Sequence, residues 1–579
     1  MGNIRIVRNY MLAASLSLFM VACSDSFFEL SPRDRISDAT VWTDPSVADL
    51  VLNEIYGYLP PYRSAGWWSE SWTDNCINVQ TWQGQAEVVR SGAMSPSNSL
   101  GTAKRYDGVN DWSWDSNFSI IRKCNVFIKN VSESTALTDD YKKNRIAEAR
   151  FLRAWYYTTV FKYFGATPII EEPLDINTQG DEIFRPRASA QETADFIARD
   201  CQDAADALPL TPSEWGRPAK GAALALKGYI LLLAARPLNN PDNDKALWAK
   251  AAAAYKQVID LGVYQLTDYY HGLFLEENEL NSEVIFPYPI RYPLAYEDPD
   301  IRFLEDLFGP AYALCEPLGW INYSIVESSV TQDLIDAYRM KDGKTIAESP
   351  LYDPEHPYEN REPRFYESVI YDGAPFRDGY IYTRKGDPHN AVDGSRSTWV
   401  TCTGYYIRKT YDERINGLLE RPKGIKNLAD WPLIRYADVL LGYAEAQNEA
   451  AGPDASALDA INRIRQRKDV AIPTVQEAYG TVTREQLHDI ILNERRIELA
   501  FEDKRYTDIT SLKLGHKLQG YVRGCEPQED LSTGKMTYGY FNVVPQYYDV
   551  TNDKNYRLPI PQWIIDRNPN LQQNSGYTQ

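Results

Sequence analysis

The sequence lacks the short motifs that mark common hydrolases and nucleotide-binding enzymes. It contains neither GxSxG nor HExxH. Gly343-Lys344-Thr345 matches the end of a phosphate-binding loop, but Tyr338 stands where that loop needs its first glycine. The five histidines show no metal-ligand spacing. We therefore expect neither catalysis nor a metal cofactor, although the 80 acidic residues leave a glycosidase carboxylate pair open until distances are known.

Excess positive charge and long hydrophobic runs are also missing. The net charge of −19 argues against nucleic acid as a partner. After Ala22 no apolar run approaches the roughly 20 residues of a membrane-spanning helix. Cysteine is scarce, at seven residues without a CxxC pair, so a zinc ribbon is unsupported. The six cysteines that follow Cys23 stand far apart, and we expect them to be mostly free and buried.

The N-terminus has the pattern of an export signal. Arg5 and Arg8 precede an uncharged run at 10–22, which is too short to span a bilayer. The sequence Met20-Val21-Ala22-Cys23 resembles the lipobox of bacterial lipoproteins, and this resemblance implies that Cys23 becomes an acylated N-terminus. The alternative is an ordinary secretory signal in which Cys23 is incidental.

Apolar residues at helical spacing dominate most of the remaining chain. Thr483 and Gln486 fit a capping box, and Gly165 fits a helix C-cap. Two Ala-rich helices form a pair close in length to a tetratricopeptide unit. The predicted helices are at 45–59, 114–128, 139–164, 190–208, 220–235, 246–261, 332–338, 433–450, 455–468 and 484–501. Residues 264–430 instead favour an irregular region with short strands, because Pro, Tyr, Gly and Asp dominate there.

Six segments, in order and nearly from end to end, resemble the SusD/RagB family of outer-membrane nutrient-binding lipoproteins. They are SPRDRISDATVW (31–42), EARFLRAWYYTTVFKYFGATPII (148–170), DLIDAYRMKDGK (333–344), WPLIRYADVLLGYAEAQNE (431–449), NERRIELAFEDKRYTDI (493–509) and LPIPQWIIDRNPNLQQNSGY (558–577). The resemblance implies a mainly α fold, in which about four tetratricopeptide-like helix pairs form a scaffold. A loop-rich irregular subdomain with short strands would pack against it.

The resemblance also implies a domain plan and a role. Residues 1–22 would be a lipoprotein signal peptide, 23–44 a lipidated tether, 45–263 an N-terminal helical part with a Trp-rich ligand loop at 62–111, 264–430 the loop-rich subdomain, and 431–579 a C-terminal helical part with an extended tail. The family implies a non-catalytic protein, lipid-anchored in the outer membrane and facing the cell surface. It would capture oligosaccharide for a SusC-like TonB-dependent transporter. A peptide-binding member of the family and a lipid-anchored glycoside hydrolase remain alternatives.

The charged motifs that match the family favour a structural interpretation. Glu494 and Glu498 lie one helical turn apart beside an apolar stripe, and buried charges must pair or cost several kcal/mol. We expect them to form a buried ion network with Arg495, Arg496 and Arg505, and we expect the same of Arg435 and Asp438.

The ligand candidates are aromatic and amide side chains in loop sequence. Sugar rings present an apolar C–H face and a hydroxyl rim, so a site for them needs aromatic platforms with polar partners at the edges. The candidates, from loops that supply the site in the family, are Trp67, Trp68, Trp72, Asp74, Asn75, Asn78, Trp82, Trp320, Asn322 and Tyr323. The alternative is that these aromatic residues anchor long loops to the scaffold. A structural Ca²⁺ at Asp298 and Asp300, or at Asp549 and Asp553, has no supporting motif.

Overall fold

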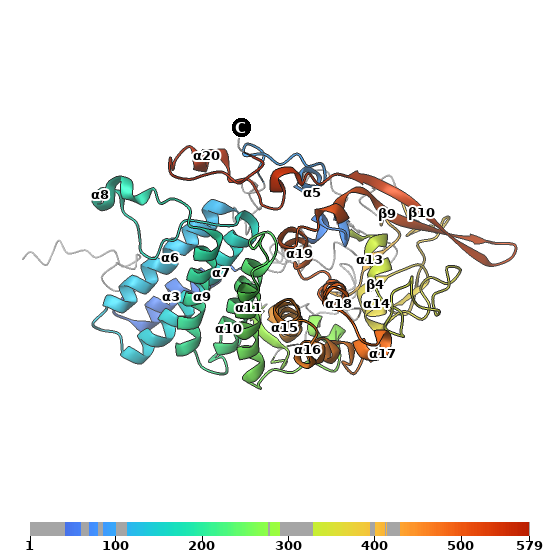
Figure 1. Ribbon diagram of the computed structural model, residues 1–579, viewed down its shortest axis with the longest axis horizontal. Coiled ribbons are helices and arrows are strands. Elements are labelled where there is room, and N and C mark those ends of the chain that lie inside the picture. The colour runs from blue at the N-terminus through green and yellow to red at the C-terminus, as the bar shows by residue number, and fades with distance from the viewer. Residues whose placement is uncertain are drawn as a thin grey trace, which may run out of the picture.

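The computed structural model shows an elongated protein with parallel-lying helices at one end and a loop-rich part at the other (Figure 1). It describes residues 41–59, 69–78, 85–99, 113–275, 278, 280–289, 328–393, 400–410, 413 and 429–577. Of the helices in these ranges, none has both the length and the apolar character that a bilayer crossing requires.

Long helices stacked side by side form the scaffold; from α3 to α16 each packs against the next in the series, and α18 packs against α15 (Figure 1). This arrangement confirms the predicted mainly α, tetratricopeptide-like fold. The series comprises α3 (Pro45–Tyr56), α6 (Trp114–Glu133), α7 (Asp139–Phe164), α9 (Ala190–Ala207), α10 (Lys220–Ala235), α11 (Lys245–Asp260), α15 (Tyr436–Ala451), α16 (Ala455–Arg465) and α18 (Arg484–Glu498).

Local sequence sets the ends of these helices. The Thr138 hydroxyl accepts a hydrogen bond from the backbone N–H of Tyr141 at the start of α7, and Gly165 ends this helix at φ 78°. The predicted capping box at Thr483 is present at the start of α18. That helix ends at Glu498, three residues before the predicted end.

Small residues allow α10, α11 and α15 to pack closely. The Tyr255 ring of α11 lies between Gly228 of α10 and Gly442 of α15. A Cβ atom added at Gly442 would stand 2.5 Å from Cζ of Tyr255, and one at Gly228 would stand 2.6 Å from Cδ1. The glycines therefore provide the space that the tyrosine ring fills.

The other elements are short, apart from one hairpin. The short helices are η2 (Glu70–Trp72), α5 (Gln85–Arg90), α8 (Ile176–Gln179), η5 (Gly180–Ile183), η6 (His271–Phe274), α13 (Gln332–Ala337), α14 (Pro363–Ser368), α17 (Val475–Tyr479), α19 (Arg505–Ser511), η9 (Gly515–Leu518), η10 (Thr551–Asp553) and α20 (Gln562–Ile565). The strands pair antiparallel in twos: β1 (Cys76–Asn78) with β3 (Ser328–Val330), β2 (Val284–Tyr288) with β8 (Trp431–Arg435), β4 (Val369–Ile370) with β7 (Tyr406–Ile407), β5 (Ala374–Phe376) with β6 (Gly379–Ile381), and β9 (Gly520–Asp530) with β10 (Lys535–Gln546).

One predicted helix needs correction, and one hairpin is missing from the predictions. The predicted helix at 433–450 begins only at Tyr436, because the five buried residues before it form β8 and pair with β2. A short run that is buried on both sides fits a strand and a buried helix equally well. The long hairpin of β9 and β10, which projects from the loop-rich end (Figure 1), is absent from the predictions, although Met536 and Tyr538 are more shielded than their neighbours, as strand alternation requires.

The C-terminal tail is strapped across the scaffold. The backbone N–H of Leu558 donates to the carbonyl of Tyr163 at 2.7 Å, and the Asn574 side chain donates to the carbonyl of Phe164 at 3.0 Å. Leu558, Ile560 and Leu571 join the same apolar cluster as these end residues of α7. The extended tail thus covers the end of α7.

Candidate functional site

The ten predicted ligand residues divide into two groups. Six of them lie outside the described residues, namely Trp67, Trp68, Trp82, Trp320, Asn322 and Tyr323. The predicted lipidation site, Cys23, also lies outside the described residues. The other four, Trp72, Asp74, Asn75 and Asn78, belong to one described segment, 69–78, which we call the anchor segment.

The four residues in the anchor segment are buried. The Trp72 ring is fully enclosed and meets the Tyr506 ring edge to face, with centroids 5.1 Å apart. Asp74 receives two hydrogen bonds of 2.8 Å from the guanidinium of Arg505. Asn78 lies in β1 and is also buried. In this conformation the four side chains face the interior, which is the anchoring role that we considered as the alternative to ligand contact.

Two parts of the scaffold hold the anchor segment. From α18, Arg496 donates to the Asn75 side chain at 2.8 Å and lies 3.1 Å from the Asp74 carboxylate. On the other side, the Thr331 hydroxyl donates to the backbone carbonyl of Asp74 at 2.6 Å. The segment is therefore fixed between the C-terminal helices and the start of α13.

Electrostatics differ between the two acids of this segment. Burial alone would raise the pKa of Asp74, but Arg496 and Arg505 outweigh burial and hold the pKa well below its usual range. For Glu70 burial dominates and raises the pKa to about 7, even though Oε1 accepts hydrogen bonds from the Asn75 side chain and the backbone N–H of Phe501.

The pairing of β1 with β3 fixes where the described chain borders two predicted ligand segments. Asn78 is the register partner of Ser328 in an antiparallel ladder. The stretch that contains Trp82 follows Asn78, and the stretch that contains Trp320, Asn322 and Tyr323 ends just before Ser328. Because the strands are antiparallel, both stretches leave the ladder at the same end.

The segment 400–402 lies next to this edge of the β1–β3 ladder. The backbone N–H of Cys402 donates to the Ser329 hydroxyl at 3.2 Å, and the backbone N–H of Asp393 donates to the carbonyl of Thr401 at 3.1 Å. The side chains of Ile77 and Cys402 pack with Val522 and Val544 from the base of the β9–β10 hairpin. We call the β1–β3 edge, with its neighbours at 400–402, the loop base.

The charged residues of α18 are buried in ion networks, as predicted, but the partners of Glu494 and Glu498 are arginines outside this helix. Glu498 is fully buried, and its carboxylate accepts hydrogen bonds of 2.7 Å from Arg364, Arg435 and Arg467. Burial alone would raise the pKa of Glu498, but the three guanidiniums hold it well below the usual range. This carboxylate therefore stays ionised and enclosed, which suits a structural role and not proton transfer.

The other predicted members of the network are paired as well. Glu494 forms ion pairs with Arg364 and with Arg465. Arg495 lies 2.8 Å from Asp438 and belongs to a neighbouring cluster in which Arg236 binds Glu445 and Asp508. The first cluster joins α18 to Arg364 of the loop-rich part, and the second joins α10, α15, α18 and α19. Both confirm the structural interpretation of the motif.

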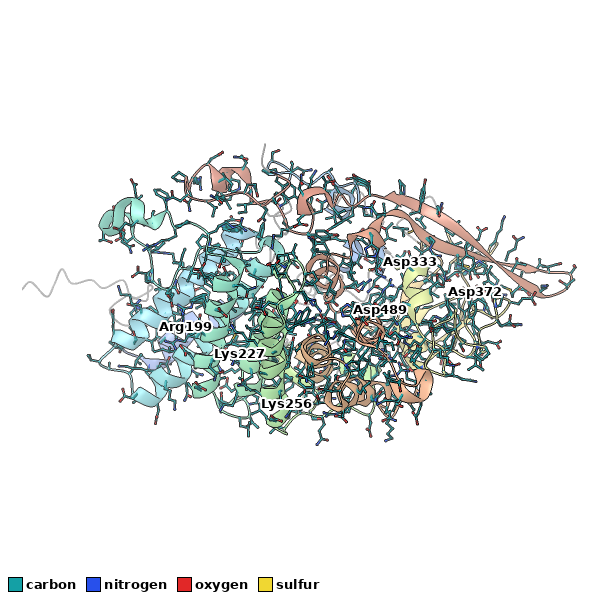
Figure 2. All side chains as sticks on the ribbon, viewed as in Figure 1. Arg199, Lys227, Lys256, Asp333, Asp372 and Asp489 are labelled. Carbon is teal, nitrogen blue, oxygen red and sulfur yellow. The ribbon has the colours of Figure 1, made fainter. Side chains whose placement is uncertain are left out.

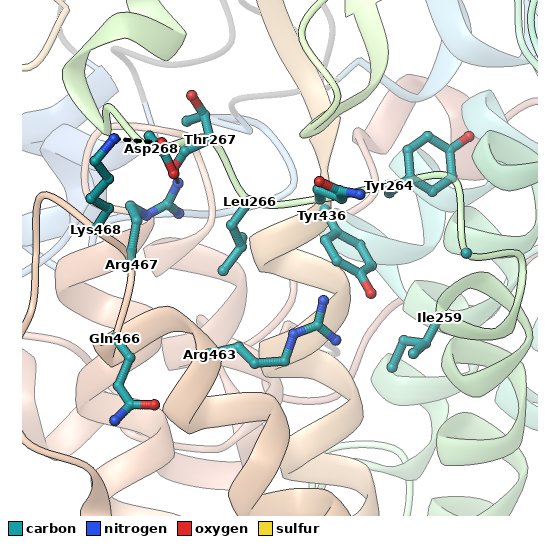
Figure 3. A pocket seen from close by; sticks show the side chains of 12 residues that line it. Ile259, Tyr264, Leu266, Thr267, Asp268, Tyr436, Arg463, Gln466, Arg467 and Lys468 are labelled. Carbon is teal, nitrogen blue, oxygen red and sulfur yellow. Dashed lines mark hydrogen bonds and ion pairs between the residues drawn. The ribbon is translucent and has the colours of Figure 1, made fainter.

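A solvent-open groove lies elsewhere, between the end of α11 and the end of α16 (Figure 3). Its volume is about 690 Å³, and no predicted ligand residue lines it. The Arg463 guanidinium lies over the Tyr436 ring, 5.1 Å from its centroid, and Lys468 pairs with Asp268 at one side of the groove (Figure 3). Because two helix C-termini meet here, Arg463 offsets their partial negative charge.

The structure also bears on the cysteine and calcium expectations. The cysteines in the described ranges are all buried, as predicted, and Cys124, Cys201 and Cys525 are free; the other two are Cys76 and Cys402. Asp549 and Asp553 each pair with a lysine, at 3.3 Å and 2.7 Å. Asp298 and Asp300 lie outside the described residues.

Comparison with known proteins gives consistent matches along the chain. The family model described as "SusD family" matches residues 309–577, and the model described as "Starch-binding associating with outer membrane" matches residues 37–232. The SusD-like protein P2 of Formosa agariphila is 27% identical, over 97% of this chain and 98% of that protein.

Solved structures match as well. A SusD-like protein of Bacteroides fragilis has a TM-score of 0.75 and 25% identity, covering 94% of this chain and all of that chain. A second protein of the same organism, described as a SusD-like carbohydrate-binding protein, has a TM-score of 0.70 and 27% identity, covering 92% of this chain and all of that chain.

Proposed function

Because the chain belongs to the SusD/RagB family, we propose that it is a non-catalytic glycan-binding lipoprotein of the outer membrane. It captures oligosaccharide at the cell surface and passes it to a SusC-like TonB-dependent transporter. The observation that carries this proposal is the loop base, where the predicted ligand segments around Trp82 and Trp320 leave the same end of one ladder. A matched relative described as carbohydrate-binding supports the ligand class.

The ligand site consists of the predicted residues that the anchor segment does not bury. Trp67, Trp68, Trp82 and Trp320 provide stacking surfaces, and Asn322 and Tyr323 bond to sugar hydroxyls. The anchor segment contributes indirectly: Asp74 and Asn75 are bound to the scaffold and fix the segment that precedes Trp82 in the sequence. Such a division fits a binding site whose ligand residues are held by a rigid scaffold.

The non-catalytic assignment is supported by the state of the buried acids. Glu494 and Glu498, the acids nearest to a catalytic pattern in the sequence, are enclosed and bound by arginines. A glycosidase needs two carboxyl groups that both reach the substrate, and one of them must hold a proton at neutral pH. Release of reducing sugar from a bound polysaccharide by the purified protein would overturn this part of the proposal.

The binding experiment is isothermal titration with a panel of oligosaccharides, using the mature chain. We expect at least one oligosaccharide to bind, and we expect the triple variant Trp67→Ala/Trp82→Ala/Trp320→Ala to lose that binding. The control is Trp563→Ala, since Trp563 is 39% exposed on α20 and outside the loop base. Unchanged affinity in the triple variant would refute the site, and binding of peptides alone would assign the protein to the peptide-binding alternative.

The location and the partner have their own test. We propose that acylation of Cys23 anchors the chain in the outer membrane, and that 24–44 is the tether. Wild-type protein should be cleaved when intact cells are treated with protease, and it should copurify with a TonB-dependent transporter. A Cys23→Ser variant should leave the membrane fraction. Protection of the wild-type protein from external protease would place it on the periplasmic face instead.

A further inference from the structure

Two tyrosines stand exposed on one face of the β5–β6 hairpin, in the loop-rich part. Tyr380 is 61% exposed and Tyr382 is 38% exposed. They share this face because side chains of a strand alternate, and Ile381 between them is buried. Pro375, the register partner of Tyr380 on β5, is exposed as well. We call Pro375, Tyr380 and Tyr382 the tyrosine row.

The geometry of the row is fixed by its neighbours. The two tyrosine rings are nearly parallel, at 27°, with centroids 6.4 Å apart. The Arg384 guanidinium lies over the Tyr382 ring, 4.4 Å from its centroid. Arg384 is itself held by Asp372 at 3.0 Å and by Glu529 of β9 at 2.5 Å. The row is therefore a preorganised surface that continues from Tyr380 through Tyr382 to Arg384.

A single exposed tyrosine needs no explanation, because much of any protein surface is apolar. An ordered row is different, since it combines apolar faces with polar edges. Phenol hydroxyls lie at the ends of the rings, and the exposed residues Asp378 and Lys385 flank the row. A pyranose ring has the matching chemistry, with a C–H face to stack and hydroxyl groups to bond.

A short series of hydrogen bonds connects the row to the loop base. The backbone N–H of Val392 donates to the carbonyl of Thr383 at 3.0 Å, directly after Tyr382. From there Asp393 bonds to Thr401, and Cys402 bonds to Ser329 of β3. Figure 2 shows Asp372, which holds Arg384, at the end of the molecule from which the β9–β10 hairpin projects. The row and the loop base thus belong to one connected part of the protein.

We propose that the tyrosine row is a second carbohydrate contact, which binds a pyranose unit of a long glycan chain while another unit occupies the loop site. This inference rests on the proposed glycan-binding function and adds a surface to it. A polysaccharide that reaches both contacts gains affinity from the second one, because that contact is made at high effective concentration. In this proposal a trisaccharide occupies the loop site alone and gains nothing from the row.

The test compares Tyr380→Ser/Tyr382→Ser with wild type in affinity gel electrophoresis and titration. The polymer probes are amylopectin, xyloglucan, arabinoxylan, galactomannan and alginate, and the short probe is a trisaccharide of the linkage that binds. The matched control is Tyr521→Ser/Tyr540→Ser, since these tyrosines are about equally exposed but belong to β9 and β10. Equal melting temperatures verify that the variants fold, as expected for exposed side chains.

We expect the Tyr380/Tyr382 variant to bind the polymer about tenfold more weakly, which corresponds to about 1.4 kcal/mol. Its affinity for the trisaccharide should stay within about twofold of wild type, and the control should bind both probes normally. The inference is overturned if polymer affinity is unchanged, if the trisaccharide is lost equally, or if the control loses as much. It is also overturned if the variant loses affinity for a proline-rich peptide while polymer binding stays intact. If wild type binds no polysaccharide, the proposed function fails, and the second contact fails with it.

Discussion

Replacing Asp74 with asparagine should destabilise the protein far more than the same change at an exposed acid. Asp74 is buried and lies 2.8 Å from Arg505 and 3.1 Å from Arg496. The substitution keeps the shape of the side chain but leaves two buried guanidiniums without their counter-charge. Breaking a buried ion pair by removing one partner costs about 3–5 kcal/mol. Because the amide carbonyl of the introduced side chain can still accept from one arginine, we expect about 3 kcal/mol.

Asp268 provides the matched control, because its carboxylate lies at the same 2.8 Å from its partner, Lys468, but both side chains are largely exposed. Asp268→Asn should leave the free energy of unfolding essentially unchanged. Urea unfolding followed by circular dichroism measures both variants. Equal losses in the two variants would refute the argument that burial, and not the short distance, makes the Asp74 pair important.

The pH dependence of the same experiment tests the electrostatics. The folded-state pKa of Asp74 is held well below its ordinary value, so its ionised form stabilises the fold above about pH 4. That contribution is lost progressively as the pH falls through the folded-state pKa. The stability gap between wild type and Asp74→Asn should therefore be constant above about pH 4 and should shrink below it.

Three further predictions concern the same interior. Burial raises the pKa of Glu70 from 4.5 to about 7, so between these pH values the folded state binds more protons than the unfolded state, and stability falls as the pH rises. Glu70→Gln should therefore remove a penalty of about 3 kcal/mol at pH 8 and change stability little at pH 4. A gain in stability that is independent of pH would contradict this cause. Gly442→Ala should lower stability by about 1–3 kcal/mol through overpacking against Tyr255. The control Gly539→Ala should be nearly neutral, because its Cβ would meet only a carbonyl at 3.4 Å. Equal melting temperatures of the two variants would show that the helices adjust. Burial raises the pKa of the Cys124 and Cys525 thiols to about 12. A thiol reagent should therefore label none of the five described cysteines until urea is added. Rapid labelling of the native protein would disprove their burial.

Much of the helical scaffold can be predicted from the sequence, because each helix carries its own signals. The bounds of α7 and α10 agree with prediction, since Gly165 ends the first and Pro237 follows the second closely. The β8 strand is missed because its residues are buried on both faces, and their apolar run resembles a buried helix. The β9–β10 hairpin is missed because a bulge at 542–544 interrupts the alternation that would reveal it.

The candidate site is harder to predict, because composition does not distinguish a buried aromatic residue from an exposed one. Trp72 and Tyr380 both stand in sequence rich in polar and aromatic residues, yet the first is enclosed and the second is exposed. The partner of Asp74 is a residue hundreds of positions away, and a single sequence gives no sign of that pairing. Only the Tyr-Ile-Tyr alternation at 380–382 could have indicated an exposed strand face in advance.

The bond between Asp74 and Arg505 also has a consequence for how the chain acquires its structure. The two residues are 431 positions apart, so the bond cannot form until nearly the whole polypeptide has been synthesised. The N-terminal helices can form earlier from local contacts, but the anchor segment lacks its counter-charges until α18 and α19 are present. Folding of the anchor segment is therefore a late event, and a chain truncated before Arg505 would retain helices without a fixed anchor segment.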